Sequence, residues 1–114
     1  MMIPIVLFAI AALGGAFLAA LRFQKKELPF PVAILHGLLA ASGLVALLLA
    51  VVNGTATGSA KIALGLFVVA ALGGFFLFSL HLRKRELPIP VVLVHAVVAV
   101  VAFAILVIGV LGMG

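Results

Sequence analysis

The stretch AALGGAFLAALRFQKKELPFPVAILH, residues 11–36, recurs 59 positions later as AALGGFFLFSLHLRKRELPIPVVLVH, residues 70–95. Fifteen of the twenty-six aligned positions are identical. Each copy joins the end of one apolar segment to the start of another through a short charged turn. Since a repeated supersecondary unit signals a repeated architecture, the sequence predicts two tandem helical hairpins.

Four apolar segments have the length that a bilayer-crossing helix needs, about 20 residues. They cover approximately residues 3–23, 31–52, 61–82 and 90–111. Of the 114 residues, 68% are hydrophobic and 8% are charged, a composition far from that of soluble domains. We therefore expect an all-α integral membrane protein with a single domain, 1–114. Repeat 1 covers about 1–52, a linker covers 53–60, and repeat 2 covers about 61–114.

The turns predict how the four helices are arranged. Each contains Glu-Leu-Pro-x-Pro, at 27–31 and 86–90, and proline is tolerated in the first turn of a helix. Short turns make neighbouring helices antiparallel, which gives an up-down-up-down bundle with the second and fourth helices on one diagonal. Because both hairpins enter from the same side, we expect parallel repeats related by a pseudo-twofold axis along the membrane normal.

Six of the seven basic residues lie at the two hairpin turns, within 22–26 and 83–85. The positive-inside rule places loops 22–30 and 81–89 in the cytoplasm and both termini outside, as expected in a bacterial inner membrane. The formal charge of +5 therefore indicates topology and not nucleic-acid binding. The first span lacks a basic segment before it and matches the third span, so we interpret it as a retained helix and not a signal peptide.

The residue types that are missing exclude several kinds of site. The chain has no Cys, which excludes disulfides, thiolate zinc sites, iron–sulfur clusters and covalently attached haem. It has no Asp, and its two acids, Glu27 and Glu86, lie at span ends. A buried acidic relay for proton or cation transport therefore has no candidate residues.

Two histidines occupy matching places inside apolar spans. His36 and His95 differ by 59 positions, as do the pairs Gly14-Gly15 and Gly73-Gly74. Each histidine lies about five residues into its helix, roughly 8 Å from the turn, and the glycines lie about two helical turns from the same end. An ionisable side chain inside a membrane span indicates function by default. We expect a layer with two imidazoles on one diagonal of the bundle and glycines on the other.

One haem b fits such a layer. Adjacent helix axes lie roughly 8–10 Å apart, so diagonal helices are far enough apart for an iron with an imidazole on each side. The spacing predicts His36 and His95 as the axial ligands. The glycines leave room for the macrocycle, and Arg22 with its repeat counterpart His81 lies where haem propionates are expected. The cofactor-binding residues predicted in this way are Gly14, Gly15, Gly73, Gly74, Arg22 and His81.

This pattern of histidines and glycines resembles the haem-binding bundle of membrane b-type cytochromes, the respiratory cytochrome b and cytochrome b561 group. In that group, histidines on transmembrane helices ligate haem b and glycines on neighbouring helices make room for it. The resemblance covers His36, His95 and the four glycines. It departs from the larger members, which carry two ligand histidines per helix and two haems. It implies a single-haem electron carrier that works with a quinone or a larger redox complex, and not a stand-alone enzyme.

Other functions remain open from the sequence. The first alternative is a non-enzymatic accessory or scaffold subunit of a membrane complex, in which the histidines bond to backbone or lipid. A haem or metal carrier and a small transporter are further alternatives, although the parallel repeat and the lack of buried charge oppose transport. A homo-oligomer with its haem between chains requires histidines that face outward. We expect an intrachain site, because small residues line both histidine stripes.

Overall fold

The structure of the protein is a computed structural model that describes residues 1–112. Over these residues it contains four α-helices and no strand. The helices are α1 (Met2–Phe23), α2 (Phe30–Val52), α3 (Gly58–Leu82) and α4 (Ile89–Val110). Each is long and apolar enough to cross a membrane. The prediction of an all-α membrane protein with four spanning helices is confirmed.

The helix boundaries follow local chemistry. Helices α2 and α4 begin directly after Pro29 and Pro88 and carry a second proline in their first turn, where a missing N–H costs nothing. Helix α3 begins three residues before the predicted span, because the Thr57 side chain accepts a hydrogen bond from the Ala60 N–H at 3.1 Å. Hydropathy alone does not register such a cap, which satisfies one free N–H at the helix start.

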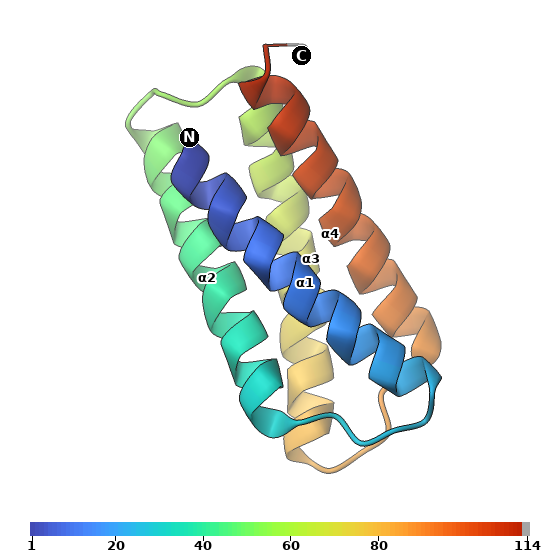
Figure 1. Ribbon diagram of the computed structural model, residues 1–114. Helices are drawn as coiled ribbons and strands as arrows, with labels where there is room; N and C mark the ends of the chain where they lie inside the picture. The colour runs from blue at the N-terminus through green and yellow to red at the C-terminus, as the bar shows by residue number, and fades with distance from the viewer. Residues whose placement is uncertain (113–114) are drawn as a thin grey trace.

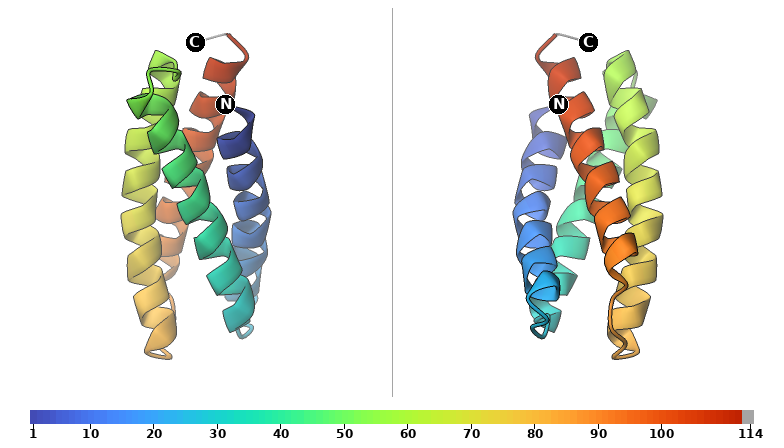
Figure 2. Two further views of the ribbon diagram at one scale, coloured as in Figure 1. Left: turned by 90° about the vertical axis from the view of Figure 1, so that its left-hand side faces the viewer. Right: turned by 90° about the vertical axis from the view of Figure 1, so that its right-hand side faces the viewer.

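The helices form an up-down-up-down bundle (Figure 1). Both side views show them along one long axis, with the start of α1 and the end of α4 at one end and the turns 24–29 and 83–88 at the other (Figure 2). Backbone contacts join α1 to α2, α3 to α4, α2 to α3 and α1 to α4. Helices α1 and α3 are therefore diagonal to each other, and so are α2 and α4. The long dimension of 41 Å matches a bilayer with its headgroup regions, about 40–45 Å.

Repeat-related residues meet at the centre of the bundle. The rings of Phe8 and Phe67, which differ by 59 positions, stack with centroids 3.8 Å apart and planes within 1° of parallel. Leu47 and Leu106, another repeat-related pair, are fully buried beside this stack. These paired positions show that the pseudo-twofold axis runs through the interior. Close packing of this kind is a main source of helix association in membranes.

The Phe8–Phe67 stack depends on a glycine. A Cβ atom on Gly43 of α2 would lie 3.1 Å from the Phe8 ring. Gly43→Val should therefore displace Phe8 and destabilise the bundle by about 1–3 kcal/mol, as overpacked cores do. Thermal unfolding in mild detergent, followed by circular dichroism, measures the loss. Gly37→Val on the same helix is the matched control, since a Cβ atom there meets nothing within 4 Å. Equal losses for the two variants would contradict this account of Gly43.

Candidate functional site

The two membrane histidines face each other across the bundle. His36 comes from α2 and His95 from α4, the diagonal helices, and their ring centroids lie 6.4 Å apart. The ring planes are nearly perpendicular, at 89°. Both side chains are partly buried. The structure thus brings together, within one chain, the two residues that the sequence singles out as ligands.

Each imidazole is anchored to the other helix of its own hairpin. His36 Nδ1 lies 2.7 Å from the carbonyl oxygen of Ala11 in α1, and His95 Nδ1 lies 2.8 Å from that of Ala70 in α3. Because a carbonyl oxygen only accepts hydrogen bonds, Nδ1 donates in both and carries the proton of the neutral ring. The lone pair is then on Nε2, the nitrogen that remains free to bind a metal.

The glycine pairs make these hydrogen bonds possible. A helical carbonyl points along the axis toward the N–H four residues later, so the Ala11 oxygen lies beside positions 14 and 15. A Cβ atom on Gly15 would lie 2.8 Å from His36 Cε1, and one on Gly14 would lie 3.6 Å from His36 Cβ. Because glycine has no side chain at these positions, the His36 imidazole can approach the Ala11 oxygen. This oxygen then accepts a hydrogen bond from the imidazole in addition to the one within its own helix.

The second hairpin repeats this arrangement with slightly more space. A Cβ atom on Gly74 would lie 3.2 Å from His95 Cε1, and one on Gly73 would lie 3.6 Å from His95 Nδ1. All four predicted glycines thus lie against the imidazole of their own hairpin. Their predicted contact with a macrocycle remains a prediction, because the structure gives them this other neighbour.

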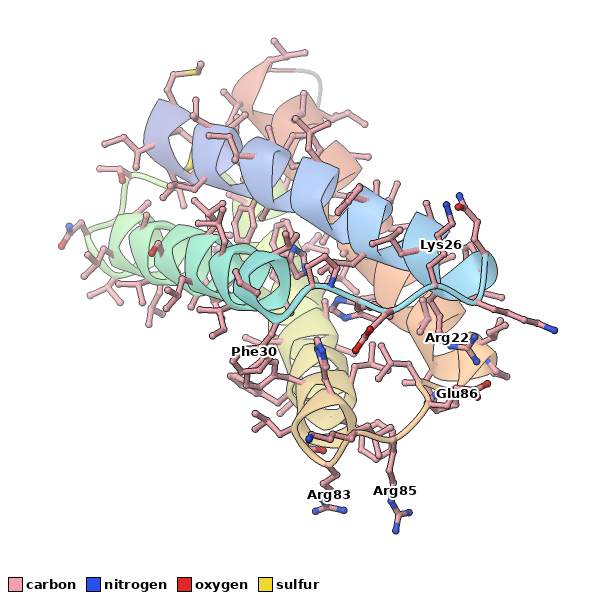
Figure 3. All side chains as sticks on the ribbon, turned by 60° about the horizontal axis from the view of Figure 1, so that its bottom comes forward. Arg22, Lys26, Phe30, Arg83, Arg85 and Glu86 are labelled. Atoms are coloured by element: carbon pink, nitrogen blue, oxygen red, sulfur yellow. The ribbon has the colours of Figure 1, made fainter. Side chains whose placement is uncertain are left out.

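Arg22 joins the two hairpins at the turn end of the bundle. It is 8% exposed, and its Nε donates to the Leu87 carbonyl oxygen at 2.6 Å. Its terminal nitrogen also pairs with Glu86 Oε1 at 2.8 Å. The side chains of Arg22 and Glu86 lie next to each other in Figure 3. A predicted propionate partner is therefore already paired with a carboxylate of the chain itself.

His81, the repeat counterpart of Arg22, has different neighbours. Its ring lies edge-on to Phe30, with centroids 5.5 Å apart, and to Phe78 at 6.4 Å. Its repeat-equivalent acid would be Glu27, which is exposed, whereas Arg22 reaches Glu86. The pseudo-twofold symmetry of the bundle is therefore broken at the turn end, where Arg22 and His81 occupy repeat-equivalent positions.

Several site residues have no clear signature in the sequence. The acceptors Ala11 and Ala70 were missed, although each precedes the second glycine of its pair by four residues, the offset of a helical carbonyl. Glu86 was interpreted only as part of a turn. Its pairing with Arg22 has no local signal, because the two residues belong to different hairpins.

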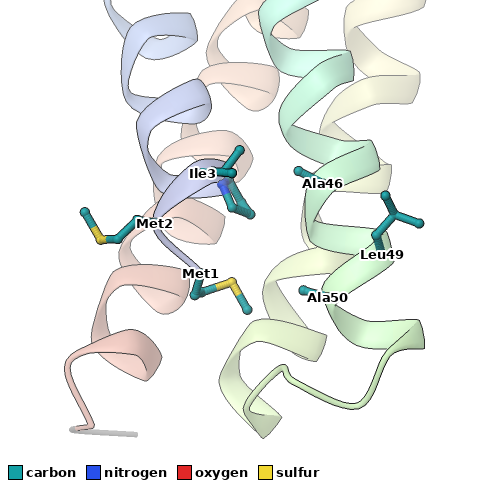
Figure 4. Close-up of a pocket in the computed structure, with 7 residues that line it drawn as sticks. Met1, Met2, Ile3, Ala46, Leu49 and Ala50 are labelled. Atoms are coloured by element: carbon teal, nitrogen blue, oxygen red, sulfur yellow. The ribbon is translucent and has the colours of Figure 1, made fainter.

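Two hollows on the surface lie away from the histidine pair. One lies between the start of α1 and the end of α2, at the end of the bundle away from the turns (Figure 4). Its lining is apolar and consists of Met1, Met2, Ile3, Pro4, Ala46, Leu49 and Ala50. A lining of this kind suits lipid chains and offers no ligand atoms for a metal or a cofactor.

The histidine pair can supply two nitrogen ligands, one from α2 and one from α4. Within residues 1–112, no third His, Cys, Asp or Glu joins it to form a larger ligand group. A tetrahedral zinc site takes four protein ligands when structural and three when catalytic. Two facing imidazoles instead suit a metal whose remaining ligands come from its own cofactor.

The fit between glycine and imidazole predicts how sensitive each hairpin is to substitution. Gly15→Ala should weaken the His36–Ala11 hydrogen bond and cost about 1–2 kcal/mol, the scale of interhelical hydrogen bonds in membranes. Gly74→Ala should cost less, because the added Cβ atom would lie 3.2 Å from the imidazole Cε1, compared with 2.8 Å for Gly15→Ala. Thermal unfolding in detergent ranks the variants. Gly65→Ala is the control, since its Cβ atom meets nothing within 4 Å. A control as unstable as Gly15→Ala would refute this explanation.

The broken symmetry at the turn end predicts unequal roles for Arg22 and His81. Arg22→Gln should destabilise the bundle by about 1–3 kcal/mol, because it leaves the partly buried Leu87 carbonyl and the Glu86 carboxylate without their donor. His81→Gln changes the repeat-equivalent position and should cost clearly less. Chemical unfolding in mixed micelles measures both. If the two substitutions have equal effects, the Arg22 contacts do not hold the hairpins together.

No protein-family model matches the chain, and comparisons with curated proteins and with solved structures found no match. A functional assignment therefore depends on the chemistry of the facing histidines and of the turn end.

Proposed function

We propose that the protein is a membrane-embedded b-type cytochrome that binds one haem b between α2 and α4 and transfers electrons. The observation that carries this proposal is the pair of facing imidazoles, His36 and His95. Both present the Nε2 lone pair because both Nδ1 atoms are held by backbone carbonyls. In apolar surroundings, an Nε2 lone pair that accepts no hydrogen bond costs free energy. This cost favours a bound metal at Nε2.

The distance between the rings supports a shared metal. Two imidazoles on opposite sides of one metal, each with its nitrogen at about 2 Å, have ring centres roughly 6 Å apart. The observed centroid distance is 6.4 Å.

The residues of the chain would then divide the work. His36 and His95 would hold the iron, and the carbonyls of Ala11 and Ala70 would fix the orientation of the two rings and raise their basicity. Arg22 closes the bundle at the turn end, and the apolar helices exclude water. A haem b held by both histidines would supply one-electron transfer rather than oxygen chemistry. Gly14, Gly15, Gly73, Gly74, Arg22 and His81 remain the proposed neighbours of the macrocycle and its propionates.

The position of the site suggests the partners of the proposed carrier. The histidine layer lies in the half of the bundle nearer the basic turns, which the positive-inside rule places in the cytoplasm, with both termini outside. We propose a bacterial inner membrane as the setting. One haem in one half of the bilayer does not carry an electron across it, so we propose exchange with a quinone or a larger redox complex.

The close fit of each histidine in its own hairpin favours a second candidate. The imidazoles already have a hydrogen-bond partner and a glycine surface, which is what a purely structural histidine needs. In that case the protein is an accessory or scaffold subunit of a membrane complex, and each histidine joins the two helices of a hairpin.

Absorption spectra of the protein purified in mild detergent separate the two candidates. For the cytochrome, we expect a Soret band and sharp α and β bands after dithionite, and their loss in His36→Ala and His95→Ala. His81→Ala is the matched control: it removes a proposed propionate neighbour but no proposed iron ligand, so the sharp bands should remain.

Each alternative outcome has a clear meaning. A protein that stays colourless after haem is added refutes the cytochrome and favours the accessory subunit. A broad high-spin spectrum that survives either ligand substitution indicates loosely held haem and contradicts axial ligation by the pair.

A further inference from the structure

Exposed cations gather at one end of the bundle. They lie on the two hairpin turns, which are adjacent in space (Figures 1 and 3). Figure 3 shows Arg83 and Arg85 extending away from the helices. The five exposed basic residues are Lys25, Lys26, Arg83, Lys84 and Arg85. At the other end the only Lys or Arg is Lys61.

Little negative charge opposes these cations. The chain has two acids, and Glu86 is already paired with the buried Arg22. Glu27 is the other acid and is exposed beside Lys26. The turn end therefore presents a strongly positive surface, at the depth where helices of this length meet the headgroup region.

Two of the five cations occupy a backbone position that normally belongs to glycine. Lys25 and Lys84 have φ angles of 58° and 57°, in the left-handed region that is unfavourable for residues with a Cβ atom. Both are the first residue after a helix C-cap. In each turn the next N–H, of Lys26 or Arg85, closes the helix end by bonding to the carbonyl of Leu21 or Leu80. Helices usually place glycine or asparagine at this position.

At the opposite end of the bundle, glycine occupies the equivalent left-handed positions. Helices α2 and α4 also end in a residue with a left-handed backbone, and there the residue is glycine, Gly54 with φ 74° and Gly112 with φ 77°. The chain thus uses glycine for both caps at one end and lysine for both caps at the other. Lys26, Arg83 and Arg85 already supply a positive turn, so setting the topology does not require lysine at the strained positions.

We propose that the turn end binds the phosphate groups of anionic phospholipids, and that Lys25 and Lys84 are retained at a cost to the backbone because they contact those headgroups. The occupant is a lipid and not a soluble anion, because the cations surround the ends of spanning helices. Clusters of four to eight basic residues directly beside membrane helices attract anionic lipids. This inference does not depend on haem binding.

The test is lipid binding by the full-length protein in neutral detergent. Native mass spectrometry during titration with phosphatidylglycerol or phosphatidylcholine gives the dissociation constants. For wild type, we expect phosphatidylglycerol to bind at least tenfold more tightly. The double variant Lys25→Gly/Lys84→Gly should lose about 10- to 30-fold in this preference. Its melting temperature in neutral detergent should rise by a few degrees, because glycine relieves both left-handed positions.

Two further variants keep the result interpretable. Lys61→Gln removes a charge at the opposite end and should leave the lipid preference unchanged. Arg83→Gln/Arg85→Gln removes two cations without altering a left-handed residue. It should lose the preference to a similar extent, even if the glycine variant folds poorly.

Three outcomes would overturn the proposal. In the first, the glycine variant is stabilised but keeps the full preference for phosphatidylglycerol, so that the two lysines have no lipid contact. In the second, Lys61→Gln weakens binding as much as the turn variants, so that attraction is a matter of net charge. In the third, inorganic phosphate at the same concentration displaces the lipid, which indicates a site for a free anion.

Discussion

The hydrogen bond from each imidazole Nδ1 to an alanine carbonyl of the neighbouring helix constrains how the two helices of each hairpin pack at the histidine layer. It requires a helical carbonyl that is open to a second donor, and therefore glycine beside it. It also brings the two helices of a hairpin close together at the histidine layer, since a Cβ atom on Gly15 would meet the His36 ring at 2.8 Å. Finally, it leaves Nε2 as the only nitrogen with a free lone pair. Packing within the hairpin and the chemistry of the site thus have one cause.

The separation of the two imidazoles is decided by different contacts. His36 and His95 belong to different hairpins, so their distance depends on how the hairpins pack against each other. On one side of the histidine layer the Phe8–Phe67 stack joins α1 to α3. At the turn end Arg22 of α1 reaches Glu86 and Leu87, just before α4. The two imidazoles, with ring centroids 6.4 Å apart, lie between these two attachments. The contacts between the hairpins therefore set the distance between the two candidate ligands.

The duplicated sequence does not produce a fully symmetric molecule. The interior keeps its twofold pairing at the phenylalanines, leucines and histidines, where both copies have the same residue. The symmetry fails at the turn end, where Arg22 has no equivalent long cation in the second copy. His81 is too short to repeat its reach and packs against Phe30 and Phe78 instead. The second copy therefore lacks the inter-hairpin contacts that Arg22 makes with Glu86 and Leu87.

The sequence by itself determined the four helices, their order and the layer that holds the histidines. The lengths of the apolar segments and the prolines of the turns define the helices locally, and the 59-residue repeat places the two histidines at matching positions. Tertiary contacts do not change these properties. The cap at Thr57 extended one helix by a turn that hydropathy does not register. Only the tertiary structure decided that the glycines pack against imidazoles, that alanine carbonyls anchor the rings, and that Arg22 pairs with Glu86. These contacts join residues of different helices, and their partners depend on distances that no local pattern encodes.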